Sequence, residues 1–152
     1  MTTSDAGDGS GVPLDPDVGA RPPHLRPAAL GLVFAGGAVG TALRAAIGLA
    51  VRPVHGVPFA TIGIDVVGAL VLGALLELLA LRGDDSGARR AVRLALGTGF
   101  CGGFTTYSSL ALDTGTLLLG GSPGAAAAYA VGTTLLGLLA CWVGVRLAGR
   151  LR

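Results

Sequence analysis

Residues 99–110, GFCGGFTTYSSL, combine three glycines with four hydroxyl side chains inside a long apolar segment. The hydroxyl residues are Thr105, Thr106, Ser108 and Ser109. A helix that breaks here and restarts would present unpaired N–H groups, which favour anions. The carbonyl groups freed at the same break suit a hard cation. The stretch therefore predicts an ion site at membrane depth, where irregular backbone is tolerated only if it is buried in protein or lines a cavity.

Two charged side chains fall inside other apolar segments. Arg44 lies in the segment before residue 51, and Asp65 lies about two turns inside the segment that begins at residue 59. An ionisable group at membrane depth indicates a functional site by default. The alternative is a structural role, in which Asp65 is buried in its protonated form or paired with Arg44.

The residues after the break divide into two helical faces. Tyr107 and Leu110, three positions apart, share one face, and Thr106, Ser109 and Asp113 share the next. One wall of this helix is therefore predicted to be aromatic or apolar and the neighbouring wall polar.

Known catalytic patterns are missing from the chain. Residues 97–102 match GxGxxG, but neither a preceding strand nor an acidic residue about 20 positions later accompanies the match. His24 and His55 are isolated, and no Cys/His cluster has the spacing of metal ligands. We expect no enzyme activity.

Composition places these residues in a membrane. The 152-residue chain is 51% hydrophobic and only 13% charged, with a mean hydropathy of +0.71. We expect an all-α integral membrane protein with helical spans at about residues 28–51, 59–81, 94–119 and 125–147. The third segment has 26 residues, which as one helix would measure about 39 Å and exceed the hydrocarbon thickness. The glycines within it favour a break near the middle.

Charge placement predicts the topology. Residues 1–27 contain four aspartates and five prolines and are expected to be a disordered tail, followed by one transmembrane domain over residues 28–152. Nine arginines flank one side of the four spans, whereas only Arg52 lies on the other side. The positive-inside rule then places both termini in the cytoplasm. A net charge of +2 gives no indication of nucleic-acid binding.

Three motifs resemble the Fluc/CrcB family of fluoride channels: GGAVGTALR (36–44), TIGIDVVGALVLG (61–73) and GTGFCGGFTTYSS (97–109). The resemblance covers residues 28–147. It implies a bacterial inner-membrane channel that exports fluoride passively and reduces fluoride toxicity. It also implies an antiparallel dimer of four-helix subunits with a structural sodium ion at its centre. The backbone carbonyls of Gly102 and Thr105 match the family's sodium ligands.

The chain departs from the family pattern at three positions. Asp65 stands where the family has asparagine, and Tyr107 and Leu110 stand where it has two phenylalanines. We expect six residues to line the anion pathway and two others, Arg44 and Asp113, to have a structural or vestibule role. The pathway residues are Asp65, Thr106, Tyr107, Ser108, Ser109 and Leu110.

The fixed orientation has a consequence for assembly. A subunit that inserts in one direction only cannot form an antiparallel dimer with itself, so we expect a related partner of opposite orientation in a heterodimer; a homodimer is the alternative. Two other functions fit the sequence. One is a small multidrug exporter, although such proteins carry an acid in the first span, where this chain has Arg44. The other is a non-conducting subunit of a heterodimeric fluoride channel.

Overall fold

The computed structural model describes residues 26–51, 53 and 58–151, and within these ranges the chain is helical with no strand. The elements are α1 (Pro27–Ala50), α2 (Phe59–Leu81), α3 (Gly87–Val92), the π-helix η2 (Arg93–Cys101), α4 (Gly102–Phe104), α5 (Tyr107–Leu119) and α6 (Pro123–Gly149). The predicted all-α fold class is confirmed. Residues 1–25 of the predicted tail, with His24, and the loop residues Arg52 and His55 lie outside the described residues.

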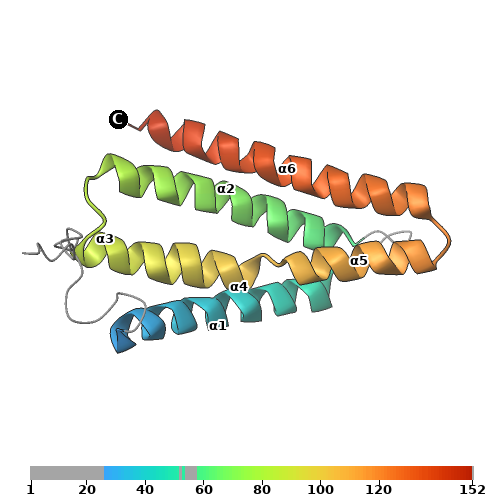
Figure 1. Ribbon diagram of the computed structural model, residues 1–152, viewed down its shortest axis with the longest axis horizontal. Helices are drawn as coiled ribbons and strands as arrows, with labels where there is room; N and C mark the ends of the chain where they lie inside the picture. The colour runs from blue at the N-terminus through green and yellow to red at the C-terminus, as the bar shows by residue number, and fades with distance from the viewer. Residues whose placement is uncertain (1–25, 52, 54–57, 152) are drawn as a thin grey trace, which may run out of the picture.

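Four lengths of helix run side by side (Figure 1). Three of them, α1, α2 and α6, are each long and apolar enough to cross a membrane. The fourth consists of α3, η2, α4 and α5 in line. α2 packs along α6, and α1 packs along η2 and α4. Helix α1 begins at the end of the molecule where α6 finishes, as expected for four spans (Figure 1).

The third length of helix begins at Gly87, seven residues before the predicted span. The added turns carry Arg89 and Arg90 and continue the helix beyond its apolar part. Arg89 donates to the backbone carbonyls of Arg82 (2.6 Å) and Asp84 (2.9 Å), and so ties the preceding loop to the helix. The sequence-based boundary followed hydrophobicity alone and therefore missed this polar extension.

The break in the third length of helix lies at Thr105 and Thr106, both of which are extended (φ −86°, ψ 154° and φ −159°, ψ 123°). The prediction of a break near the middle is thus confirmed. The glycines that favoured it, from Gly97 to Gly103, stay helical. Two of them, Gly99 and Gly103, pack closely against α1.

Glycines form the contact between α1 and the helix before the break. A Cβ on Gly40 would collide with the carbonyl of Phe100, and one on Gly103 would collide with the carbonyl of Gly37. Small residues let two membrane helices approach at backbone distance, where dispersion contacts and polar bonds stabilise the pair. The Gly36/Gly40 pair therefore positions α1 against the break.

A second close crossing joins α2 to α6. A Cβ on Gly73 would collide with the carbonyl of Cys141, and one on Gly144 would collide with the carbonyl of Leu70. By contrast, Gly137 has no atom within 4 Å of an added Cβ, so it takes no part in packing within this chain.

Gly40→Ala should destabilise the protein by about 1–3 kcal/mol, because the methyl group meets backbone that cannot move aside. Gly48→Ala is the matched control on the same helix, since a Cβ there meets nothing within 4 Å. Unfolding of both variants in detergent by SDS titration measures the difference. Equal stability of the two variants would show that the α1 contact is not tight.

Candidate functional site

Helix α1 satisfies one backbone group at the break. The hydroxyl of Thr41 donates to the carbonyl of Gly103 (3.3 Å), and Arg44 Nε donates to the same carbonyl (3.2 Å). Arg44 Nη1 also donates to the Ser109 hydroxyl (3.4 Å). Arg44 thus spans the break and contacts both halves of the third length of helix. The half-buried intramembrane arginine therefore links the helix before the break to the helix after it.

Helix α2 satisfies a second group. Asp65 Oδ1 accepts the N–H of Thr106, the residue that precedes α5, at 3.4 Å. Asp65 therefore satisfies the backbone N–H of the residue that precedes the restarted helix. The alternative of an Asp65–Arg44 ion pair is not seen, since the ion pairs among the described residues all involve Asp85.

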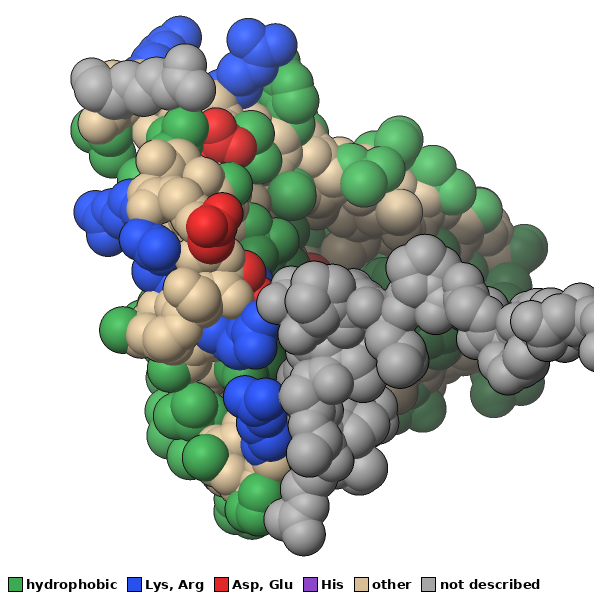
Figure 2. All heavy atoms as spheres, turned by 60° about the vertical axis from the view of Figure 1, so that its left-hand side comes forward, with side chains coloured by type: hydrophobic (Ala, Val, Ile, Leu, Met, Phe, Trp, Pro, Cys, Tyr) green, Lys and Arg blue, Asp and Glu red, His purple; other side chains and the backbone are tan. Residues whose placement is uncertain are grey.

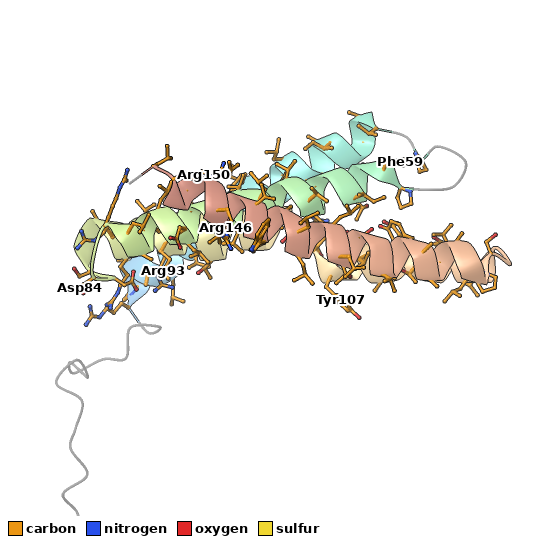
Figure 3. All side chains as sticks on the ribbon, turned by 90° about the horizontal axis from the view of Figure 1, so that it is seen from above. Phe59, Asp84, Arg93, Tyr107, Arg146 and Arg150 are labelled. Atoms are coloured by element: carbon orange, nitrogen blue, oxygen red, sulfur yellow. The ribbon has the colours of Figure 1, made fainter. Side chains whose placement is uncertain are left out.

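A cavity of about 340 Å³ opens beside the break. It is lined by α2, the break, α5 and α6, and it brings together four of the predicted pathway residues. These are Asp65, Thr106, Tyr107 and Leu110. Tyr107 is 82% exposed and projects from the middle of the molecule (Figure 3). The predicted shared face of Tyr107 and Leu110 therefore lines this cavity.

The four hydroxyls do not form one cluster. Thr105 donates to its own helix at Cys101 (2.9 Å), and Thr106 and Ser108 bond to each other (2.7 Å). Ser109 turns toward Arg44 on α1 instead of toward the cavity. Of the four, Thr105 and Thr106 line the cavity.

The first residues of α5 have backbone N–H groups that lack a backbone acceptor among the described residues. Within the described part of the chain, the N–H groups of Tyr107, Ser108 and Ser109 donate to no backbone carbonyl. Such N–H groups and the helix dipole together attract negative charge. The start of α5 is thus suited to an anion at the cavity, with Asp65 as the competing negative group.

Two carbonyls at the break could serve a cation. Among the described residues, no hydrogen bond reaches the carbonyl of Gly102 or that of Thr105. A Cβ on Gly102 would meet nothing within 4 Å, so this side of the helix is open. Carbonyl oxygens are the ligands that hard cations prefer, but two are fewer than such an ion takes. The donor chemistry fits sodium only if further oxygens come from outside this chain.

Asp113 joins three helices. Its Oδ2 atom accepts hydrogen bonds from Thr61 on α2 (2.8 Å) and from the buried Tyr129 on α6 (3.0 Å). A structural or vestibule role was predicted for Asp113, without either of these partners. The structure places it in a polar contact between helices.

Thr133 was missed from the sequence. It is 3% exposed, lines the cavity, and its hydroxyl has no hydrogen-bond partner among the described residues. A signal was present: Tyr129, Thr133, Gly137 and Cys141 recur every four residues, which places them on one face of an otherwise apolar helix. This face of α6 supplies the second wall of the cavity.

A family model described as "CrcB-like protein, Camphor Resistance (CrcB)" matches residues 31–145. That range contains the break, the cavity and both intramembrane charges. The chain belongs to the Fluc/CrcB family. The matched range also covers most of the four helical lengths, so the shared sequence is the membrane domain itself.

Relatives in the Fluc/CrcB family resemble the chain over most of their length. Fluoride-specific ion channel FluC 2 of Leifsonia xyli is 48% identical over 83% of this chain and 87% of its own. Fluoride-specific ion channel FluC 1 of Cutibacterium acnes is 47% identical over 78% and 83%. Fluoride-specific ion channel FluC of Thermus thermophilus is 43% identical over 79% and 93%.

Tyr129→Phe should lower stability by about 0.5–1.5 kcal/mol, because Asp113 loses a hydrogen bond inside the helix bundle. Tyr107→Phe removes the same hydroxyl from an exposed ring and is the matched control. The midpoint of SDS-induced unfolding reports both. A Tyr129→Phe midpoint equal to that of the control would contradict a structural role for the Asp113 contact.

Proposed function

We propose that this chain is a subunit of a fluoride-selective ion channel. The observation that carries the proposal is the cavity at the broken helix, which is lined by Tyr107, the first residue of α5 and one of three whose backbone N–H donates to no backbone carbonyl among the described residues. The names of the relatives supply the ion: each is a fluoride-specific ion channel. Family membership favours this function over the small multidrug exporter.

Fluoride is small and strongly hydrated, so a pore must replace its water with hydrogen-bond donors. Thr106, a lining residue of the cavity, carries one hydroxyl donor, and the Thr133 hydroxyl is buried in the α6 wall without a partner among the described residues. The positive edge of the Tyr107 ring can add to these donors. Leu110 excludes water beside them. No chemical step is required, and fluoride moves down its own gradient.

The described arginines support an orientation. Apart from Arg44, they lie just before α1, between α2 and α3, in α3 and the residue after it, and at the C-terminal end of α6. All of these positions lie at the end of the molecule where α1 begins and α6 finishes (Figure 1). In a bacterial inner membrane this bias favours the cytoplasm for that end. Passive flow from the cytoplasm would then lower the toxic concentration of fluoride inside the cell.

A second subunit completes the proposed channel. The carbonyls of Gly102 and Thr105 form an open, two-ligand half-site, and the same pair from an antiparallel partner would make a four-oxygen site for sodium. Such an ion would hold the two breaks together at the dimer centre. Because the arginine bias fixes one orientation, we propose that the partner is a related chain of opposite orientation. A homodimer, or a channel in which only the partner conducts, is the alternative.

Reconstitution tests the function. Proteoliposomes that hold this chain together with an oppositely biased family member from the same genome should release fluoride, but not chloride, when a fluoride electrode records efflux. Replacing sodium by N-methyl-D-glucamine on both sides should weaken the dimer and reduce the flux.

Reconstitution of this chain alone distinguishes failure of the heterodimer proposal from failure of the channel proposal. Rapid fluoride efflux from this chain alone, with every terminus accessible on one face, would overturn the heterodimer and leave the channel standing. No fluoride efflux from the pair would overturn the channel itself.

Asp65→Asn should raise fluoride flux at neutral pH at least about fivefold, because repulsion between a carboxylate and fluoride a few ångströms apart exceeds 1 kcal/mol at protein dielectric. The amide is isosteric and still accepts the Thr106 N–H. Glu77→Gln, near the far end of the same helix and outside the cavity, is the charge-matched control. An unchanged or lower flux in Asp65→Asn would show that the acid does not oppose the anion.

A further inference from the structure

A groove of about 480 Å³ lies between the start of α1 and the α3–η2 segment, away from the cavity at the break. Its lining joins two kinds of side chain. Three are arginines, Arg26, Arg90 and Arg93, and the apolar part includes Leu30, Val33 and Leu94. Charged groups thus lie beside an apolar wall in one concave surface.

Charge in the groove is only partly balanced. Asp85 accepts two hydrogen bonds from Arg93, from Nε (3.0 Å) and Nη2 (2.7 Å), and lies 3.7 Å from Arg90 Nε. The hydrogen bonds from Arg93 hold the pKa of the Asp85 carboxyl below its usual range, so it is ionised at neutral pH. Counting only the described residues, three arginines against one aspartate leave two positive charges. Asp85 also fixes the Arg93 side chain at the rim.

The groove lies at the ends of helices, where a membrane-spanning bundle is expected to meet lipid head groups. Arg26 precedes the first residue of α1, and Arg90 lies in the last turn of α3. Blue side chains gather along this end of the molecule (Figure 2), and Arg93 and Arg150 lie at the end opposite Phe59 (Figure 3). Leu30, which is 57% exposed, lies one turn inside α1 from Arg26, in the direction of the apolar part of the helix.

We propose that this groove binds an anionic phospholipid from the surrounding leaflet. The phosphodiester would lie among the three guanidinium groups, whose planar donors match phosphate oxygens. One acyl chain would follow Leu30, Val33 and Leu94. Basic pockets between membrane helices recognise acidic head groups in this way. The proposal depends on membrane insertion alone and is independent of the ion conducted.

Quenching of a tryptophan placed in the groove tests the site. The only native tryptophan, Trp142, is on α6, so full-length Leu30→Trp/Trp142→Phe carries a single reporter at the groove. In mixed vesicles, brominated phosphatidylglycerol should displace phosphatidylcholine from the reporter with a preference of at least about fivefold, the factor that one arginine near a membrane surface contributes. Adding Arg26→Gln and Arg90→Gln should reduce the preference to less than about twofold.

Arg82→Gln/Arg150→Gln is the matched control, because it removes the same charge from other helices and neither residue lines the groove. This control should keep the preference. Native mass spectrometry of the unsubstituted protein gives a second measure, in which phosphatidylglycerol should stay bound at detergent concentrations that remove phosphatidylcholine. Equal quenching by the two brominated lipids, or equal loss of preference in both double variants, would overturn the site.

Discussion

The structure depends on how backbone polar groups are satisfied where a helix breaks inside a membrane. Two extended residues, Thr105 and Thr106, release carbonyl and N–H groups that hydrocarbon cannot solvate. Side chains from α1 and α2 form hydrogen bonds with some of these groups. Thr41 and Arg44 donate to the Gly103 carbonyl, and Asp65 accepts a hydrogen bond from the Thr106 N–H. The groups left without a hydrogen bond among the described residues, at the start of α5 and on Gly102 and Thr105, are those to which the proposed ion sites are assigned.

Close helix packing makes that arrangement possible. Arg44 reaches the Gly103 carbonyl because Gly37, Gly40 and Gly103 bring α1 to backbone distance from α4. The buried core is correspondingly thin and made mostly of small side chains, while many large apolar residues are exposed. In a membrane those side chains face lipid or another subunit. Precision at the break therefore comes from glycine contacts and a few polar bonds more than from a large core.

Much of the fold followed from the sequence, because hydrophobic length and the glycine-rich interruption are local signals. The spans and the central break were predicted on that basis. The exact break, two residues after Gly103, depends on α1 packing and was not predictable from glycine content. The same limit explains the site: Asp65, Thr106, Tyr107 and Leu110 were expected together, but Ser109 turns to Arg44 and Thr133 went unnoticed. The direction of Ser109 depends on its contact with Arg44 of α1, a neighbour distant in sequence, and such a contact cannot be read from the local pattern.

We propose that the broken helix forms an anion site completed by α6. Thr133 on α6 has no other evident role, because its hydroxyl is buried and has no partner among the described residues. Thr133→Val keeps the side-chain shape and removes that donor, whereas Thr134→Val removes a hydroxyl already bonded to Ala130 (2.8 Å). Fluoride efflux from reconstituted channels is the deciding measurement. We predict that fluoride efflux falls about tenfold in Thr133→Val, the effect of one lost hydrogen bond of about 1.4 kcal/mol. Efflux through Thr134→Val should be unchanged. Equal flux in the two variants would contradict the proposal.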